Sequence, residues 1–393
     1  QQGSGGGGGK GGGGGEGSLA YLVYQPFGGL SNQMMSLHAA MELAFLLDRV
    51  LVVPHILTEN GQGPPIPWSA TQNFDALIAA APAGAIMNMD EFLTLNLRPE
   101  RIYEISISAR HVEQNLKYFT QLGWGDVPVE RMPDVTFSPA AWHRRAGACG
   151  AQVLALSSLF NAYSHAERRK LWRADAVEKE WSRGLQRAAR AVHPGIDRAV
   201  GQAFESLKEK ANGILNHIAC MHVRRGDFEG YCQDLKKEAN SKNARPAMRR
   251  LIKTSNLCFV QKQHVFRTLD KVQWPRQEGG QLLNGSSEVF PIYMATDDLK
   301  FAKDPDFSRS YSIFTLIDLL PSAKNGGIQK TSGKDYIPDI WLPIVDQHIC
   351  ARARLLVLNA FSTYSDSIKL IAETQDQEDE VQSPKKKILN WQK

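Results

Sequence analysis

The sequence predicts an α/β protein built on parallel sheets, and three observations support this prediction. An apolar strand at residues 21–24 is followed by a Gly/Pro/Asn loop, a helix at 34–47 and a second apolar strand at 50–54, which makes a βαβ unit. From residue 217 onward, short apolar strands alternate with helical segments. The chain has 393 residues, enough for two domains. We therefore expect a doubly wound second domain that begins near residue 210.

The second half contains four candidate strands, each a short apolar run. They lie at residues 217–224, 289–295, 313–317 and 354–359. Helices are expected near 245–269, from Asp297, over 338–353 and over 362–374, with a charged loop at 225–245. Earlier in the chain, residues 58–140 predict loops and small elements, and residues 165–214 predict helices.

The two ends of the chain have compositions that do not predict a packed core. Residues 3–17 are almost pure glycine, so residues 1–18 predict a flexible linker. Residues 376–393 predict a charged, solvated tail that ends in a short packed segment at Ile388, Leu389 and Trp391. The remaining chain divides into an N-terminal domain at 19–210 and a C-terminal domain at 211–375.

Charge and hydropathy argue against two classes of partner. The net charge of +5 is mild, and the arginine-rich run at 144–198 matches no nucleic-acid-binding module. We interpret this run as an amphipathic helix with a solvated basic face, with an anion-binding surface as the alternative. No apolar run approaches the ~18 residues of a membrane span. Because the chain begins with Gln1 and not with Met, we expect that an N-terminal signal or anchor was removed.

The five cysteines do not have the spacing of a zinc site, because none lies in a CxxC motif. Cys220 and Cys350 lie in apolar runs and predict buried thiols. Cys232 and Cys258 flank a charged loop and can pair in an oxidising compartment. Asn284 begins a single Asn-Gly-Ser glycosylation sequon in a polar loop.

The segment His222-Val223-Arg224-Arg225-Gly226 places two basic side chains at the end of a buried strand. Alternation along the strand puts His222 and Arg224 on one face and Arg225 on the other. Arginine's planar fork suits a diphosphate, so we predict an anion site here. The structural alternatives are a core histidine and an ion pair between Arg224 and Asp227.

Other strand ends supply further candidates, because ligands of doubly wound sheets bind beyond the carboxyl ends of the strands. The first strand leads into a loop whose glycines permit a close backbone approach, although it lacks the GxGxxG pattern. The strand at 289–295 leads to two aspartates that suit a ribose, a base or a helix cap. The last strand leads to hydroxyls at a helix start. The candidates are Gly28, Gly29, Leu30, Asn32, Asp297, Asp298, Ser362, Thr363 and Tyr364.

Four motifs in this order resemble the GDP-fucose-dependent O-fucosyltransferases, which share an HxRR motif with α1,6-fucosyltransferases. They are GGLSNQ, HVRRGDFEGYC, YMATDD and VDQHICARARLLVLNAFSTYSDSI, spread over residues 20–372. The resemblance implies two Rossmann-like domains in the GT-B arrangement, with the nucleotide sugar in the cleft. It also implies inverting transfer of fucose from GDP-fucose to a protein or glycan acceptor, without a metal, in the lumen of the Golgi or endoplasmic reticulum.

The resemblance also assigns roles to residues. Arg224 matches the arginine on the β-phosphate, His222 the histidine beside it, and Asn32 the loop asparagine near the sugar and phosphates. Asp297 or Asp298 would face guanine or ribose, and Ser362, Thr363 and Tyr364 would surround the phosphates and base. Cys232 and Cys258 fall where some members have a disulfide. These assignments make Arg224 and Asn32 the expected catalytic pair.

GGLSNQ departs from members that carry a glutamate in the first loop, so the sequence identifies no general base. Asp227, Glu229 and His38 are candidates for that role. Two other functions stay open: a non-catalytic glycan- or nucleotide-binding module, and a transferase that uses another nucleotide sugar. The acceptor is not predicted.

Overall fold

The computed structural model describes most of the chain outside its glycine-rich start and several internal segments. The described residues are 19–58, 65–105, 112–131, 150–157, 159, 184, 187–188, 191–211, 218–226, 228–240, 259–271, 291–309, 311–320, 338–359, 362–378 and 387–390. They form two compact units. The first comprises Gln1–Phe27, Gln33–Leu57 and Ile78–Arg183, and the second comprises Gly28–Asn32, Thr58–Leu77 and Gly184–Lys393.

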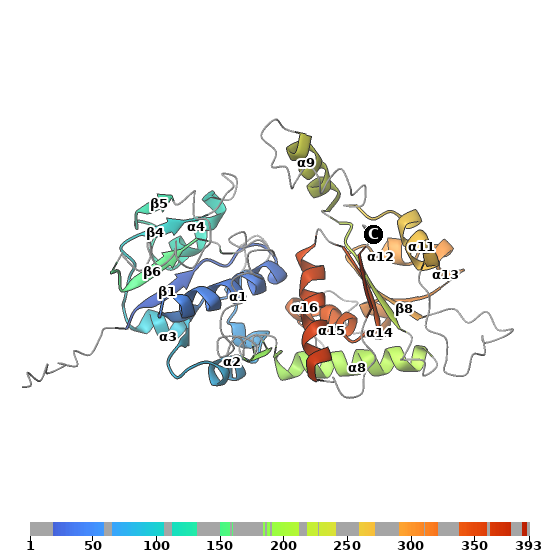
Figure 1. The fold of residues 1–393 in the computed structure, drawn as a ribbon, viewed down its shortest axis with the longest axis horizontal. Helices are drawn as coiled ribbons and strands as arrows, with labels where there is room; N and C mark the ends of the chain where they lie inside the picture. The colour runs from blue at the N-terminus through green and yellow to red at the C-terminus, as the bar shows by residue number, and fades with distance from the viewer. Residues whose placement is uncertain are drawn as a thin grey trace, which may run out of the picture. The chain divides into compact units, whose positions relative to one another are not determined.

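The first unit contains a six-stranded parallel sheet of order β3-β2-β1-β6-β4-β5 (Figure 1). Its strands are β1 Tyr21–Tyr24, β2 Val50–Val53, β3 Ile86–Asn88, β4 Ile102–Glu104, β5 Val129–Arg131 and β6 Val153–Leu156. Its helices are α1 Leu30–Leu46, α2 Phe74–Ala80, α3 Met89–Thr94 and α4 Val112–Gln121. The first turn of α1 and most of α2 belong to the second unit, together with the 3-10 turn η2 Trp68–Ala70.

Alternation along these strands builds the core of the first unit. Tyr21 and Val23 of β1 pack on one face of the sheet with Phe92 of α3 and with Phe119 and Trp124, at and beyond α4. Each such side chain contributes ~1.5–3 kcal/mol when it is fully buried. The short strands β3, β4 and β5, three residues each, fall in the stretch where we expected loops and small elements, and they complete the sheet.

The second unit contains a five-stranded parallel sheet of order β11-β10-β7-β8-β9. Its strands are β7 Ala219–Val223, β8 Pro291–Thr296, β9 Ser312–Phe314, β10 Leu355–Leu358 and β11 Lys387–Asn390. Its helices are α8 Pro194–Lys210, α9 Phe228–Asn240, α11 Lys262–Lys271, α12 Leu299–Ala302, α13 Pro305–Ser308, α14 Leu316–Leu319, α15 Leu342–Ala351 and α16 Thr363–Glu378, and the 3-10 turn η7 Asp339–Trp341 precedes α15.

Helices cover both faces of this second sheet, as expected for a doubly wound domain (Figure 1). Cys220 of β7 faces a cluster with residues of α8, α14, α15 and α16. Its neighbours Met221 and Val223 face the opposite cluster, with Val265 of α11 and Phe307 of α13. The period of two predicted for the strand is therefore confirmed, and it decides which side chains reach each face.

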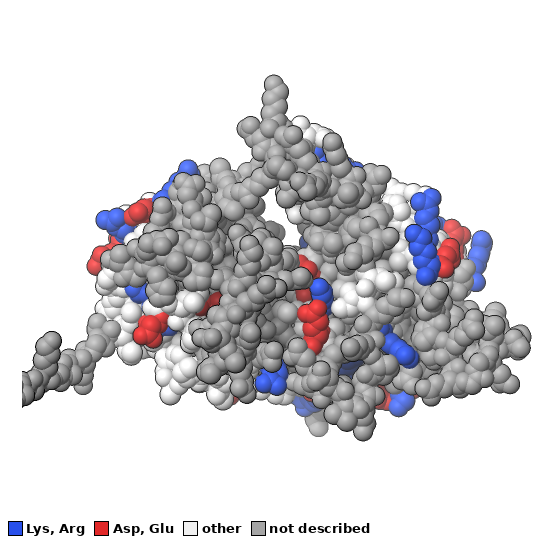
Figure 2. Space-filling model, viewed as in Figure 1, with Lys and Arg blue, Asp and Glu red and all other residues white. Residues whose placement is uncertain are grey.

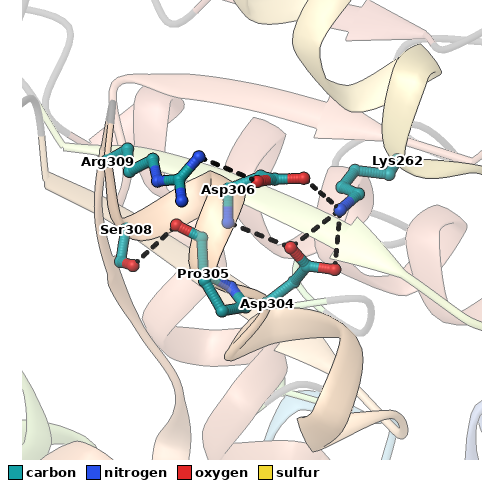
Figure 3. Close-up of polar contacts among 6 residues, drawn as sticks. All are labelled: Lys262, Asp304, Pro305, Asp306, Ser308 and Arg309. Atoms are coloured by element: carbon teal, nitrogen blue, oxygen red, sulfur yellow. Dashed lines mark hydrogen bonds and ion pairs between the residues drawn. The ribbon is translucent and has the colours of Figure 1, made fainter.

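An ion-pair cluster links α11 to α13 on the outside of the second unit. The Lys262 ammonium donates to both oxygens of Asp304 at 2.8 Å and to Asp306 at 2.5 Å, and Arg309 lies 3.6 Å from Asp306 (Figure 3). The Lys262 hydrogen bond holds the pKa of Asp304 below its ordinary value. Because these groups are partly or fully exposed to solvent, we assign the cluster a structural role that is weakened by salt.

The described surface carries charges of both signs. Figure 2 shows basic and acidic side chains interspersed over the described part of this face, without an extended basic area there. Within the described parts of the chain, no helix combines the length and the apolar character needed to cross a membrane.

Three expectations about elements need correction. The charged residues after β7 form α9, Phe228–Asn240, where we expected a loop. Helix α16 extends to Glu378, into the expected solvated tail, whereas the packed segment expected at Ile388 and Leu389 is confirmed as strand β11, which pairs in parallel with β10. The boundary expected near residue 210 would leave α8 in the first domain, whereas α8 packs against α15 of the second unit.

Some expectations fall on residues that the structure does not describe. The glycine-rich residues 1–18 lie outside the described residues, as do most of the arginine-rich run and of the helix expected near 245–269.

Candidate functional site

The strand order of the second sheet indicates a site at the carboxyl ends of β7 and β10. The order β11-β10-β7-β8-β9 reverses direction between β7 and β10, so the connections after these two strands run to opposite sides. Doubly wound sheets bind ligands in the crevice that such a reversal opens at the carboxyl ends of the strands. The predicted residues His222 and Arg224 follow β7, and Ser362 and Thr363 follow β10. The topology therefore brings together two motifs that lie about 140 residues apart in sequence.

His222 is buried near the end of β7 and contacts two residues of α16. Its Nδ1 is 2.7 Å from the Ser365 hydroxyl, which also accepts the Asn359 backbone N–H at 2.9 Å. Its ring stacks on Tyr364, with centroids 4.6 Å apart and an interplanar angle of 24°. Burial, followed by the charge of Arg224, lowers the pKa of His222 from 6.5 to about 3. His222 is therefore a neutral imidazole at physiological pH, and it contributes to an anion site through hydrogen bonding and shape, without a positive charge.

Arg224 supplies the positive charge on this face of β7. Its guanidinium lies 5.6 Å from the centre of the Phe228 ring, at the start of α9. The same charge lowers the pKa of His222 and partly offsets the rise in the pKa of Tyr364, whose main cause is burial. Arg224 therefore lies within electrostatic range of the stacked His222–Tyr364 pair.

Arg225 points to the opposite face and is held within the fold. Its guanidinium donates to the Asp298 carboxylate at 3.1 Å and to the Val260 carbonyl at 2.7 Å. The same group lies between the rings of Phe259 and Phe301, at 4.6 and 4.3 Å from their centres. Arg225 therefore anchors the turn after β7.

The two aspartates after β8 have structural roles that the sequence left open. Asp297 accepts the backbone N–H groups of Arg225 and Gly226 at 2.7 and 3.1 Å. Asp298, and not Asp297, caps α12 by accepting the Phe301 N–H at 3.0 Å. Gly226 is required in this turn because a Cβ there would lie 2.8 Å from the Asp297 carboxylate. Both carboxylates thus hold the β7 turn in place.

The start of α16 presents hydroxyls and backbone N–H groups at the end of β10. The Ser362 carbonyl accepts the Asp366 N–H at 3.2 Å, as expected of a cap position. The Ser362 hydroxyl is buried and has no hydrogen-bond partner among the described residues. A 16-residue helix directs its first N–H groups toward this point. The arrangement suits a phosphate oxygen.

The first loop is part of the second unit and is bonded to α16. Gly28 has a left-handed backbone, with φ of 69°, and a Cβ there would lie 2.5 Å from the Asn32 amide nitrogen. The Thr363 hydroxyl donates to the Asn32 side-chain oxygen at 2.7 Å, so the amide nitrogen of Asn32 lies on the side of Gly28. Leu30 packs on the apolar cluster under α15 and α16. A side chain at Gly29 would meet no atom within 4 Å, so the fold itself does not require that glycine.

Asp346 of α15 is a candidate that the sequence analysis missed. Its carboxyl accepts the Tyr293 hydroxyl and lies close enough to raise the pKa of Tyr364, the residue that stacks on His222. The Tyr364 hydroxyl itself donates to the Pro343 carbonyl at 2.8 Å. Burial raises its pKa from 3.8 to about 7. A titratable group with a pKa near 7 beside other site residues is typical of functional sites. The only signal in the sequence is a weak one, an aspartate in a largely apolar helix.

The structure is similar to crystal structures of POFUT1. For POFUT1 in complex with GDP, the TM-score is 0.56 at 16% sequence identity, over 95% of this chain and 98% of that chain. For POFUT1 in complex with GDP-fucose, the TM-score is 0.55 at 16% identity, over the same shares of the two chains. The chain has a fold similar to that of POFUT1. The fucosyltransferase NodZ from Bradyrhizobium matches with a TM-score of 0.45 at 11% identity, over 90% of this chain and 92% of that chain. No protein-family model and no curated protein matches the sequence.

Within this POFUT1-like fold, the cysteines differ from expectation. Cys220 and Cys350 form a disulfide that joins β7 to α15, with Cα atoms 5.1 Å apart, so the prediction of two free buried thiols is wrong. Cys232 is also disulfide-bonded. Cys258, its expected partner, and Asn284 of the sequon lie outside the described residues.

The candidates for general base are dispersed. Asp227 lies outside the described residues, Glu229 is exposed in the first turn of α9, and His38 is buried in α1 of the first unit. Among the described residues, no three His, Cys, Asp or Glu side chains lie together in a way that could hold a metal ion.

Proposed function

We propose that this protein transfers L-fucose from GDP-fucose to a hydroxyl of a protein or glycan acceptor, with inversion at the sugar. The observation that carries the proposal is the gathering of Arg224, the His222–Tyr364 stack and the Asn32–Thr363 pair at one strand-order reversal. The fold supports it, because POFUT1 has a similar fold and its crystal structures include complexes with GDP and with GDP-fucose.

In the proposed reaction, the acceptor oxygen forms a bond to C1 of fucose while the bond from C1 to the β-phosphate oxygen breaks. The bonding electrons leave with GDP, and the acceptor releases its proton to a base or to water. Negative charge therefore grows on the β-phosphate. A fixed guanidinium at Arg224 stabilises that charge more in the transition state than in the ground state, which is the condition for catalysis.

Neighbouring groups would hold the donor for this step. The first N–H groups of α16 and the Ser362 hydroxyl suit the phosphate oxygens, and the Asn32 amide can donate to the phosphates or the sugar. Neutral His222 adds a hydrogen-bonding ring without competing for the charge of Arg224. For the guanine, Asp346 beside Tyr364 is a better candidate than Asp297 or Asp298, whose carboxylates hold the β7 turn.

The proposal extends to architecture and location. We infer two Rossmann-like domains in the GT-B arrangement with the donor in the cleft. We also infer that Arg224 stabilises the leaving diphosphate, as a metal ion does in other glycosyltransferases. The disulfides at Cys220–Cys350 and at Cys232 support folding in an oxidising compartment such as the lumen of the secretory pathway. Membrane attachment there would require an anchor outside the described residues.

The test is a calorimetric titration of the protein with GDP, UDP and GDP-fucose, without added metal, followed by release of GDP from GDP-fucose. We expect GDP to bind and UDP to bind far more weakly. Arg224→Ala should lower the turnover of GDP-fucose by ~10²–10³, as the loss of one transition-state donor does. The matched control is Arg309→Ala, because Arg309 is an arginine of the same unit whose side chain is 78% exposed.

Two results would redirect the proposal. If GDP does not bind, or UDP binds equally well, the donor is not GDP-fucose and a transferase for another nucleotide sugar becomes the better hypothesis. If GDP-fucose binds but no fucose reaches water or any glycan or protein acceptor, the protein is a binding module that lacks turnover.

A further inference from the structure

A buried hydrogen bond joins the first turn of α1 to the middle of α15. The Gln347 side-chain nitrogen donates to the Ser31 hydroxyl at 2.8 Å. Ser31 is 9% exposed and Gln347 8% exposed, so the bond is shielded from water. The two residues lie 316 positions apart in the sequence. Their contact therefore fixes where the first loop lies in the second unit.

Gln347 is unusual in its surroundings. The other buried residues of α15 are Ile344, Val345, Ile349, Cys350 and Ala351. A buried amide costs free energy unless it is hydrogen-bonded, so an apolar residue would be the simpler choice for packing at this position. The bond to Ser31 gives the amide a specific partner in the first loop.

Asn32, the next residue after Ser31, has its side chain oriented by a second bond. Thr363 donates to the Asn32 side-chain oxygen at 2.7 Å, and the absent side chain of Gly28 leaves room for the Asn32 amide nitrogen. The Thr363 bond sets which way the amide points. The Ser31–Gln347 bond sets where the turn that carries Asn32 lies.

We propose that Gln347 is a positioning residue for fucosyl transfer, because its bond to Ser31 fixes the turn from which Asn32 donates to the diphosphate or the sugar of the donor. This inference rests on the proposed function. Gln347 acts through Ser31 and Asn32 and touches no reacting atom. A purely structural pair would stabilise the fold without affecting turnover, and the experiment separates the two roles.

The experiment compares Ser31→Ala, Gln347→Met and the double variant. Each single change leaves one buried polar group without its partner, so both should lower the melting temperature. The double change replaces both partners with apolar groups of similar size and should recover most of that stability. The readouts are melting temperature, GDP affinity, and kcat and KM for release of GDP from GDP-fucose, a reaction that needs no known acceptor.

We expect kcat to fall about 10- to 100-fold in both Gln347→Met and the double variant, since a small misplacement of a positioned group has effects of this size. GDP affinity should fall by a smaller factor than kcat, because Arg224 and the start of α16 are intact. Asn32→Ala should lower kcat, and adding Gln347→Met should lower it little further if both act through the same amide. Gln263→Leu, at an exposed glutamine of α11, is the control and should match the wild type.

Recovery of kcat together with stability in the double variant would overturn the positioning role and leave a structural pair. Fully additive effects of Asn32→Ala and Gln347→Met would also overturn it, because Gln347 would then act independently of Asn32. A wild-type protein that neither transfers nor hydrolyses fucose would overturn the proposed function and this inference together. An active wild type with unaffected Gln347 variants would overturn this inference alone.

Discussion

Gly28 and Gly29 are adjacent glycines under different constraints. Gly28 has a φ of 69° and lies against the Asn32 amide, whereas a side chain at Gly29 meets no atom within 4 Å. We predict that Gly28→Ala costs ~1–2 kcal/mol from the left-handed backbone alone. It should also lower turnover of GDP-fucose, because it displaces Asn32. Chemical denaturation and the GDP-release assay measure the two effects.

The matched control for this prediction is Gly29→Ala. It adds the same methyl group one residue later and should leave stability close to wild type. Equal losses of stability in the two variants would contradict the constraint that we assign to Gly28.

At the level of single residues, the sequence predicted those that follow simple periodic rules. The period of two along β7 separated Arg224 from Arg225 correctly, because Arg225 binds Asp298 and Val260 on the other face. It did not predict the Gln347–Ser31 bond or the role of Asp346. These depend on which helix packs beside which loop, and no local pattern encodes that contact.

Elements were predictable where hydrophobic periodicity was strong. Strands β7, β8 and β10 are buried apolar runs, and the structure confirms them. Helix α9 was missed because it is rich in charged residues and begins directly after a turn. A packed segment was expected at Ile388 and Leu389, but not strand β11, because its four residues follow a charged run and are defined by pairing with β10.

The Cys220–Cys350 disulfide links two elements of the site, since β7 carries His222 and α15 carries Asp346 and Gln347. It closes a loop across a sequence separation of 130. We predict that Cys220→Ala/Cys350→Ala lowers the free energy of unfolding by ~2–5 kcal/mol, largely because the unfolded chain is less constrained. Denaturation of both proteins with Cys232 retained measures the difference. An unchanged unfolding free energy would show that the link does not stabilise the fold.

For the molecule as a whole, two buried groups, His222 and Asp346, make the stability of the fold depend on pH in opposite directions. Burial lowers the pKa of His222 from 6.5 to about 3, so below pH 6.5 the unfolded chain binds a proton that the folded protein does not. Burial raises the pKa of Asp346 from 3.8 to about 7, so above pH 3.8 the folded protein holds a proton that the unfolded chain has lost. Acid therefore destabilises the fold through His222, and base destabilises it through Asp346.

Between about pH 4 and pH 6.5 the two effects oppose each other, since unfolding takes up one proton at His222 and releases one at Asp346. We predict that Asp346→Asn exposes the histidine effect, so its stability falls by about 1.4 kcal/mol per pH unit on acidification relative to wild type. His222→Gln should show the reverse, with relative stability falling as pH rises, and the double variant should track the wild type. Urea unfolding at pH 4.5, 5.5 and 6.5 measures these differences, and parallel curves for all four proteins would contradict the assignment. Parallel curves would mean that folding does not shift the pKa values of His222 and Asp346 in opposite directions, and that the two groups beside Tyr364 are not a neutral histidine and a protonated carboxyl.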